Sequence, residues 1–388
     1  MAIYLDNHAT TRCDPRVVEA MTPYFSDIYG NAASRSHSFG MRANAGVERG
    51  RGQVASLLGA SAKEIVFTSG ATEANNLAIL GVCRTVGRGH IITSTLEHKA
   101  VLDPIAKLEE DGFDVTRVGV DASGIMDADA VIAALRDDTI LVSIMMANNE
   151  IGTVQPLALI GAACRERGIP LHTDASQAIG KIDIDVVRDH IDLLSLTAHK
   201  FYGPKGIGAL FIRRGRPQLR LEPLQYGGGH ERGYRSGTLP VPQCVALGAA
   251  AALCENELKS GELERVKALR DDLLDSLLAV GDVALNGSRE HRLPNNINIS
   301  IGGIDSKALM MNLRDIAMSS GSACSSENLK PSHVLTAIGT EKDRVHRSIR
   351  LGLGRFTTAE EVETAKARFA DAIPKLRALS AGIPANAS

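Results

Sequence analysis

Lys200 stands where a predicted strand ends, in the run DLLSLTAHK (192–200), directly before the turn YGPKG (202–206). A lysine at the mouth of a buried strand is partly desolvated, which lowers its pKa and makes it a candidate for Schiff-base chemistry. Asp174 lies in the run HTDASQ (172–177) and places a carboxylate at the end of a second predicted strand. A lone lysine that opens a Gly/Pro loop is more often an ordinary surface residue, so neither residue is diagnostic by itself.

The run TSGATE (68–73) follows a third predicted strand and opens a predicted helix. Its small residues leave backbone N–H groups accessible, and the amino-terminal end of a helix favours an anion such as a phosphate. The same run is equally typical of a simple helix cap.

Together the three segments indicate one cofactor, pyridoxal 5′-phosphate. Its phosphate suits the helix N-terminus, its pyridine nitrogen suits an acid, and its aldehyde suits a lysine. The acid keeps the ring nitrogen protonated, so that the ring can accept electrons from a carbanion.

The elements that must position these residues alternate between strands and helices. Short β-branched runs predict seven buried strands, and the alternation predicts an α/β fold with a mainly parallel sheet covered by helices on both faces. Ligands of such sheets bind at the carboxyl ends of the strands, where the three segments fall. The predicted strands are 64–70, 90–95, 114–120, 139–145, 170–176, 192–197 and 208–214, and the predicted helices between them are 71–83, 99–111, 127–137 and 156–168.

The pattern changes near residue 241, where about forty largely helical residues begin, with an interruption at Gly261. Such a helix predicts a brace between two domains. A smaller α+β unit follows, with strand-like runs near 283–287, 295–301, 316–324 and 348–354. We expect a large cofactor-binding domain over 14–255 and a small domain formed by 1–13 and 256–388, which carries a mobile cysteine loop at about 319–330.

Composition excludes several functional classes. The 388 residues carry a net charge of −2, unlike a strongly basic nucleic-acid binder. Six cysteines without a CxxC or zinc-ligand spacing indicate reduced thiols and no metal site. No targeting segment or membrane span is visible, and no nucleotide-binding glycine motif follows a strand. We expect a cytoplasmic protein with neither nucleic acid nor membrane as a partner.

Seven motifs, in their order and spacing, resemble those of cysteine desulfurases, which are fold-type I pyridoxal-phosphate enzymes of the class V aminotransferase superfamily. The likeness runs from YLDNHATT to SIRLGLGRFT near residue 357 and is strongest to the iron–sulfur-assembly and nitrogenase-associated group. The motifs are SGATE, EHKAV, NNEIG, HTDASQ, TAHKFYGPKGIGAL, GGGHERGYRSGT and SSGSACSS.

The resemblance implies a role for each matching residue. Lys200 would bind the cofactor covalently, Asp174 would pair with the pyridine nitrogen, and Gln177 would contact the ring hydroxyl. His98 would stack on the ring and act as acid and base, and Arg350 would bind the substrate carboxylate. Asn149 would lie beside the substrate and the ring oxygen. The phosphate would be held by Ala71, Thr72, Thr197 and His199, with Thr238 reaching the phosphate of a neighbouring subunit in a homodimer.

The chain departs from the family pattern in three places. Asn7-His8 replaces the usual Tyr-Ser or Asn-Asn, and Thr197-Ala198 precedes His199-Lys200 where the family often has Ser-Gly or a single Ser. We expect both changes to disturb the chemistry very little, and the Thr197 hydroxyl can still bind phosphate. The chain also lacks the long tail with which some relatives dock a scaffold protein, which leaves the identity of the sulfur acceptor open.

Cys324 lies in a run of serine, glycine and alanine, SSGSACSS (319–326). Such a run has little to bury and predicts an exposed, mobile loop, whereas an unpaired cysteine is ordinarily buried and inert. We interpret the other five cysteines as packing residues and Cys324 as a thiol that collects sulfur at the cofactor and carries it outward.

These observations predict an L-cysteine desulfurase that forms L-alanine and a persulfide on Cys324 for transfer to a sulfur acceptor or iron–sulfur scaffold protein. One alternative is a selenocysteine lyase or a related C–S lyase. A second, from another class, is a non-catalytic interaction subunit, although such a subunit would be expected to lose Lys200 or Asp174. The sequence leaves open whether the sulfur serves iron–sulfur clusters, tRNA thiolation or another pathway.

Overall fold

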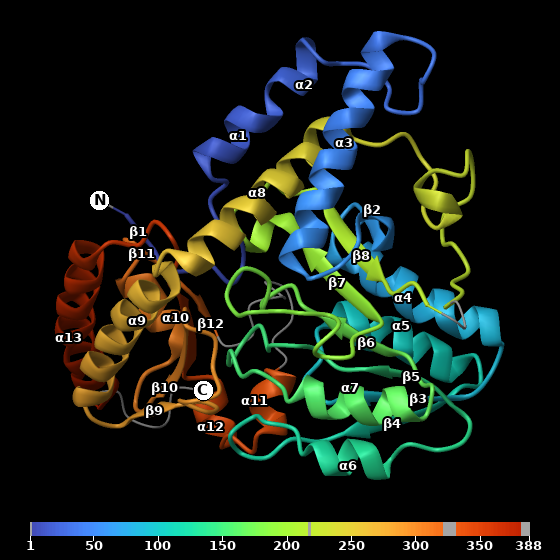
Figure 1. Cartoon of the computed structure of the whole chain (residues 1–388). Coiled ribbons are helices and arrows are strands. Elements are labelled where there is room, and N and C mark those ends of the chain that lie inside the picture. Colours follow the sequence, from blue (N-terminus) through green and yellow to red (C-terminus); the bar gives the residue numbers. More distant parts are fainter. Residues whose placement is uncertain (1, 216–218, 321–330, 382–388) are drawn as a thin grey trace.

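The computed structural model describes residues 2–215, 219–320 and 331–381. A large unit is built on a central sheet and a smaller unit on a second sheet, and two consecutive helices connect them (Figure 1). Each unit has its own buried hydrophobic cluster. Among the helices of the described ranges, none combines the length and apolar character that a membrane crossing needs.

Seven strands form the central sheet, as predicted. All neighbouring pairs are parallel except the two that β8 makes, because β8 runs antiparallel to both β2 and β7. In spatial order the strands are β2 (Ile65–Thr68), β8 (Gly208–Ile212), β7 (Leu193–Thr197), β6 (Leu171–Asp174), β5 (Thr139–Ser143), β3 (His90–Ser94) and β4 (Asp114–Val118).

The prediction that all seven strands are buried was wrong for β4. This strand lies at the edge of the sheet, and its Asp114 and Arg117 are exposed. Its two valines, Val115 and Val118, are three residues apart, so they point to opposite faces of the sheet, and each is only partly buried against a different core cluster. The other six strands are almost continuously buried, including β2 at the opposite edge of the sheet.

Helices cover both faces of the sheet, because alternate residues of each strand point to opposite sides. On β2, Val66 faces the cluster that includes α4 and α5, whereas Ile65 and Phe67 face the cluster that includes α3, α6, α7 and α8. The bounds are α3 (Ser38–Leu57), α4 (Ala71–Val86), α5 (Lys99–Glu110), α6 (Ala128–Ala133), α7 (Leu157–Glu166) and α8 (Val241–Lys259).

The predicted long helical segment is two helices, α8 and α9 (Glu262–Ala279), which are separated at Gly261 as expected. Gly261 has a left-handed backbone with φ 84°, which only glycine adopts without cost. The preceding helix packs on α3 of the large unit, and α9 packs on α13 (Ala359–Ala381) of the small unit.

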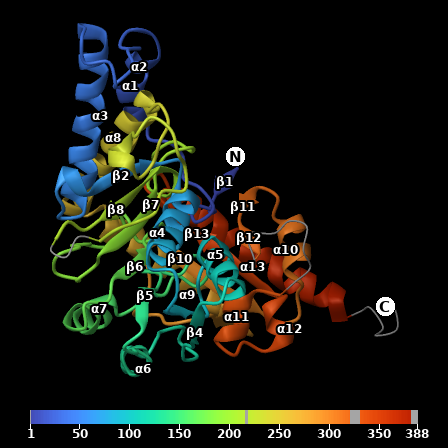
Figure 2. The same ribbon diagram turned by 90° about the vertical axis from the view of Figure 1, so that its right-hand side faces the viewer.

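The sheet of the small unit is antiparallel, with β13 (Ser348–Gly352) between β12 (Ser319–Ser320) and β10 (Asn296–Ile301), and β9 (Val283–Leu285) beyond β10. A separate two-stranded sheet brings in the other end of the chain, because β1 (Ile3–Tyr4) pairs in parallel with β11 (Ile316–Ala317); Figure 2 shows the two strands side by side. Further helices are α10 (Ser306–Asn312), α11 (His333–Ala337), α12 (Lys342–Val345), α1 (Pro15–Met21) and α2 (Pro23–Ser26), with short 3₁₀ turns η1 (Ala62–Glu64), η2 (Ala198–Lys200) and η3 (Glu231–Gly233).

Candidate active site

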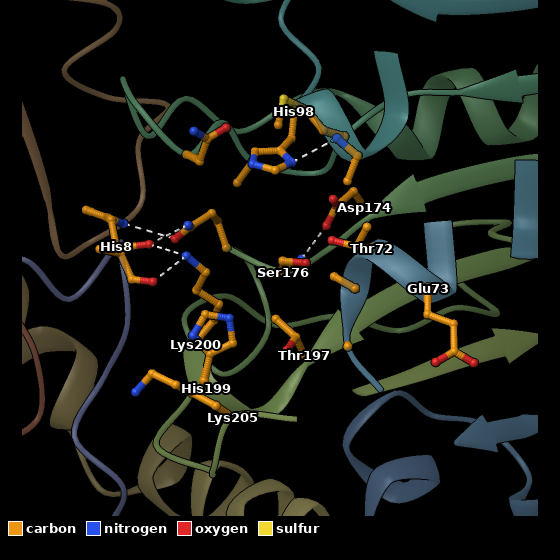
Figure 3. Close-up of a pocket in the computed structure, with 18 of the residues that line it drawn as sticks. His8, Thr72, Glu73, His98, Asp174, Ser176, Thr197, His199, Lys200 and Lys205 are labelled. Atoms are coloured by element: carbon orange, nitrogen blue, oxygen red, sulfur yellow. Dashed lines mark hydrogen bonds between the residues drawn. The ribbon is translucent and has the colours of Figure 1, made fainter. Parts of the chain in front are cut away.

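A cavity of about 610 Å³ opens at the carboxyl ends of β5, β6 and β7, and residues of both units line it (Figure 3). The structure brings together ten of the twelve residues expected at the site. Thr238 is exposed and does not line this cavity of the single chain, and Cys324 lies outside the described residues. The ten are Ala71, Thr72, His98, Asn149, Asp174, Gln177, Thr197, His199, Lys200 and Arg350.

Asp174 ends β6 and is held from two sides. Its carboxylate oxygens accept hydrogen bonds from Asn75 Nδ2 at 2.7 Å and from the backbone N–H of Ser176 at 2.9 Å. Both contacts fix the orientation of the carboxylate in a buried position. Asn75 was not among the predicted site residues, although it lies four residues after Ala71 on α4.

Lys200 closes η2, the turn that follows β7. Its Nζ donates hydrogen bonds to the carbonyl oxygens of His8 and Ala9, the latter at 2.9 Å. The amino-terminal segment is fixed along this turn, because Thr11 N donates to His199 O at 2.8 Å. The predicted Schiff-base lysine thus lies against the first ten residues of the chain, as Figure 3 shows for His8.

The amino-terminal end of α4 forms another wall. Its N-cap, Gly70, makes no side-chain capping hydrogen bond, so the first N–H groups of the helix remain for a ligand. Glu73 is neutralised by Arg235, whose Nε lies 2.8 Å from its carboxylate. Burial and the nearby lysines lower the pKa of His199 to about 4, so its ring is neutral at pH 7.

His98 is the N-cap of α5, where its Nδ1 accepts the backbone N–H of Ala100 at 3.1 Å. In the neutral ring the proton therefore sits on Nε2. The preceding Glu97 is fully buried and accepts from Met145 N at 2.7 Å and Ser94 Oγ at 2.8 Å. Burial raises the pKa of Glu97 to about 8.

Arg350, on β13, is the contribution of the small unit. It is 2% exposed, donates to Asn149 O at 2.9 Å and forms an ion pair with Asp6 at 3.1 Å. Its Nη2 also lies 3.3 Å from Ser319 Oγ. The guanidinium is therefore held in one orientation at the cavity wall.

These residues fit pyridoxal 5′-phosphate. An acid, a lysine and an uncapped helix N-terminus face one cavity, as the three functional ends of the cofactor require. Among the described residues, the buried Ser176 Oγ and Arg350 Nε lack a hydrogen-bond partner, and both residues line the cavity. Buried polar atoms normally have partners, so a polar ligand would complete them.

Several lining residues were not predicted. Most lie next to a predicted residue in the same motif, which is the signal that could have found them: Ser69, Gly70, Glu73, Ala100, Ser176, Lys205 and Gly206. Met145 and Ala147 follow β5. His8 and Ala9 come from the amino-terminal motif, in which His8 was expected only as a departure from the family pattern.

Comparisons with known proteins agree with this site. Residues 3–364 match the aminotransferase class-V family. A relative named cysteine desulfurase IscS, from Anaeromyxobacter dehalogenans (strain 2CP-C), is 53% identical over 382 residues, which cover 97% of this chain and 94% of the relative.

Two solved structures are similar over most of the chain. One, titled NifS-like protein, is 37% identical with a TM-score of 0.89 and covers 96% of this chain and 99% of its own. The other, titled SspA in complex with cysteine, is 39% identical with a TM-score of 0.81 and covers 92% of this chain and 100% of its own. The predicted family and fold class are confirmed.

Proposed function

The chain belongs to the aminotransferase class-V family, and we propose that it is a pyridoxal 5′-phosphate-dependent L-cysteine desulfurase that yields L-alanine and a persulfide on Cys324. One observation carries the proposal: Lys200, Asp174 and the uncapped N-terminus of α4 face a single cavity, with the buried Arg350 guanidinium in its wall. Relatives named cysteine desulfurase, which are 50–53% identical in sequence over 97% of this chain, support the proposal.

The cofactor would be held by residues from several elements. The bound ring supplies an electron sink for the carbon from which a proton is removed. Lys200 would bind it covalently, Asp174 would contact its nitrogen and Gln177 its hydroxyl, with His98 stacked on the ring. The phosphate would lie against the N–H groups of α4 and the side chains of Thr72, Thr197 and His199.

The substrate would be oriented by Arg350 and Asn149. A guanidinium binds a carboxylate with two parallel hydrogen bonds, which fixes the α-carbon near Lys200. Lys200 Nζ would then take the α-proton. His98 would exchange the thiol proton through Nε2, because its Nδ1 is engaged by Ala100 N.

Sulfur transfer would complete the reaction. The Cys324 thiolate attacks the substrate sulfur, a sulfur–sulfur bond forms, and the carbon–sulfur bond breaks with its electron pair on the three-carbon product. Protonation of that carbon gives alanine, and the persulfide passes from Cys324 to an acceptor.

We further propose a cytoplasmic homodimer that passes sulfur to an acceptor or scaffold protein in iron–sulfur cluster assembly. The exposed Thr238 would reach the phosphate in the second subunit. Exposed apolar side chains at Phe25, Tyr29, Phe39 and Met41 offer a surface that a second copy could cover. Sedimentation should show a dimer at micromolar concentration, and a fully active monomer would contradict this role of Thr238.

The decisive experiment compares Cys324→Ser with the wild type for alanine release and for persulfide trapped by alkylation. The variant should still bind the cofactor, and its absorbance should still change on addition of L-cysteine. It should release little alanine, and alkylation should trap no persulfide. Cys13→Ser is the control, because Cys13 is the one cysteine of the described residues that is partly exposed. Equal alanine from Cys324→Ser and wild type would contradict the mechanism and favour a lyase, and no spectral change in either would favour a non-catalytic subunit.

A further inference from the structure

A chain of buried hydrogen bonds leads from the small unit into the cavity wall. It begins at Arg292, whose Nη1 donates to Asn296 Oδ1 on β10. Asn296 Nδ2 lies 3.1 Å from His8 Nε2 and also donates to Glu150 O at 3.1 Å. At the far end, His8 Nδ1 lies 3.0 Å from Gln177 Oε1, and Gln177 Nε2 donates back to His8 O at 3.0 Å.

Each bond fixes the direction of the next. An arginine only donates, so the atom of Asn296 that meets Arg292 is its oxygen and the atom that meets His8 is its nitrogen. His8 Nε2 must then accept, which leaves the proton of the neutral ring on Nδ1. The Nδ1–H group donates its hydrogen bond to Gln177, so the oxygen of the Gln177 amide points at the ring.

The nitrogen of the Gln177 amide carries two hydrogens. One is donated to His8 O, and the other remains for the cavity that Gln177 lines. With the amide reversed, its oxygen would face the His8 carbonyl and its nitrogen would face an N–H, which are two repulsive contacts. His8 thus holds both ends of this amide.

The surroundings keep His8 in this state. Its ring is fully buried, and a Cβ added at Gly352 would lie 2.6 Å from His8 Cδ2, so the neighbouring strand leaves room for this ring only with glycine. Burial, with the cations Arg350 and Lys181, holds the pKa of His8 well below its usual value. Lys200 is the third cation that faces it, so the ring stays neutral at pH 7.

We propose that His8 is a positioning residue that holds the Gln177 amide with an N–H directed into the cavity, toward the hydroxyl oxygen of the cofactor ring. The inference rests on the proposed function, because it assigns Gln177 to that oxygen. An N–H donated there favours the more negative, deprotonated form of the bound chromophore. Its loss should shift the pH at which the absorbance of the bound cofactor changes.

The test is a pH titration of cofactor absorbance in the holoenzyme, with no substrate present. We expect His8→Ala to raise the midpoint by about one pH unit, a tenfold change in proton affinity. His8→Asn should restore a midpoint near that of the wild type, because its side-chain N–H can take the place of Nδ1–H. In a Gln177→Ala background, His8→Ala should add no further shift.

His90→Ala is the matched control. His90 is equally buried and has both ring nitrogens bonded, to Thr139 and Thr116 at 2.8 Å, but it does not line the cavity. The His90→Ala variant should leave the midpoint of the absorbance titration unchanged. If His8→Ala does not fold, His8→Leu fills the space of the ring and removes the same donor.

The outcomes separate this inference from the proposed function. The positioning role is overturned if the midpoint of His8→Ala or His8→Leu equals that of the wild type. It is also overturned if His8→Ala shifts the midpoint as much in the Gln177→Ala background as it does when Gln177 is present. A wild-type protein that shows no absorbance change on addition of pyridoxal phosphate overturns the proposed function itself.

Discussion

In the proposed reaction Arg350 would offer the substrate carboxylate a planar fork, and its Nη atoms are already held by Asp6 and Asn149. Arg350→Lys keeps the charge but loses the fork, so two parallel hydrogen bonds cannot form. We expect KM for L-cysteine to rise at least about tenfold, equivalent to the loss of roughly one charged hydrogen bond. Cofactor binding should persist. Arg347→Lys, at a half-exposed ion pair with Asp343, should leave KM unchanged.

Glu97 gives the protein a pH-dependent stability. Its pKa is raised to about 8 by burial, above the ordinary 4.5, so the folded state holds a proton that the unfolded chain loses. The stability from this group is complete below about pH 4.5 and is lost as pH rises through 8. Glu97→Gln keeps the acceptor for Met145 N, so we expect its unfolding temperature to fall less between pH 5 and 9.

The difference between Glu97→Gln and wild type should reach about 1 kcal/mol or more at pH 9, since each pKa unit corresponds to about 1.4 kcal/mol. Burial also raises the pKa of Glu150, to about 7, and this group lowers stability with rising pH in the same way. The fall of stability with pH should therefore become smaller in Glu97→Gln but should not vanish. Parallel curves for the variant and the wild type would show that Glu97 does not titrate in this range.

The residues predicted at the site follow the ends of strands or open helices, where the topology of a parallel sheet determines which side chains meet. Asp174 and Lys200 could be placed on that basis. His8 and Asn75 could not, because they reach the site through contacts between segments far apart in the chain or through a helix face. The proposed role of Thr238 would require a second copy of the chain, and Thr238 does not line the cavity of the single chain.

Among the elements, two glycines in helical surroundings should respond oppositely to alanine. Gly52 lies within α3, and a Cβ there meets nothing within 4 Å, so Gly52→Ala should stabilise the protein by about 0.5–1 kcal/mol. Gly261 has φ 84° between α8 and α9, so Gly261→Ala should destabilise it by about 1–2 kcal/mol. Chemical denaturation measures both, and a shared sign would contradict the argument.

The sequence predicts the seven strands of the large unit and the break at Gly261 because β-branched runs and a glycine between helices are strong local signals. It assigns no element to residues 15–57. The helix α3 within that range is rich in glycine, which normally disfavours a helix. The structure explains the composition: a Cβ at Gly50 would lie 2.5 Å from Cys244 O, so α3 and α8 cross closely only with glycine there.

At the scale of the molecule, Arg355 joins four segments. It bonds Asp14 at 2.9 Å and Glu262 at 2.7 Å, its backbone N–H donates to Tyr202 Oη at 2.7 Å, and its guanidinium lies over the Tyr202 ring. Removing Arg355 takes the ion pair away from the largely buried Glu262, whereas Asp14 keeps its ion pair with Arg16 at 2.8 Å. Arg355→Met should therefore lower the free energy of unfolding by about 3 kcal/mol.

The turn that carries Lys200 precedes Tyr202, so Arg355→Met should also weaken cofactor retention on dialysis. Arg368→Met is the control, since Arg368 and Asp315 form an exposed pair whose loss should cost less than about 1 kcal/mol. A similar loss of stability in both variants would show that Arg355 is no more than a surface contact.

The amino-terminal segment has partners that are synthesised late. Asn7 donates to Gly352 O across 345 positions of the chain, and β1 pairs with β11. On a ribosome that adds about 5–20 residues per second, the first ten residues remain without these partners for roughly 20–70 s. A nascent chain can form its central sheet early, but the wall around Lys200 closes only once Gly352 has emerged. We therefore expect cofactor loading to follow the synthesis of β13, and a chain that stops short of β13 to load poorly.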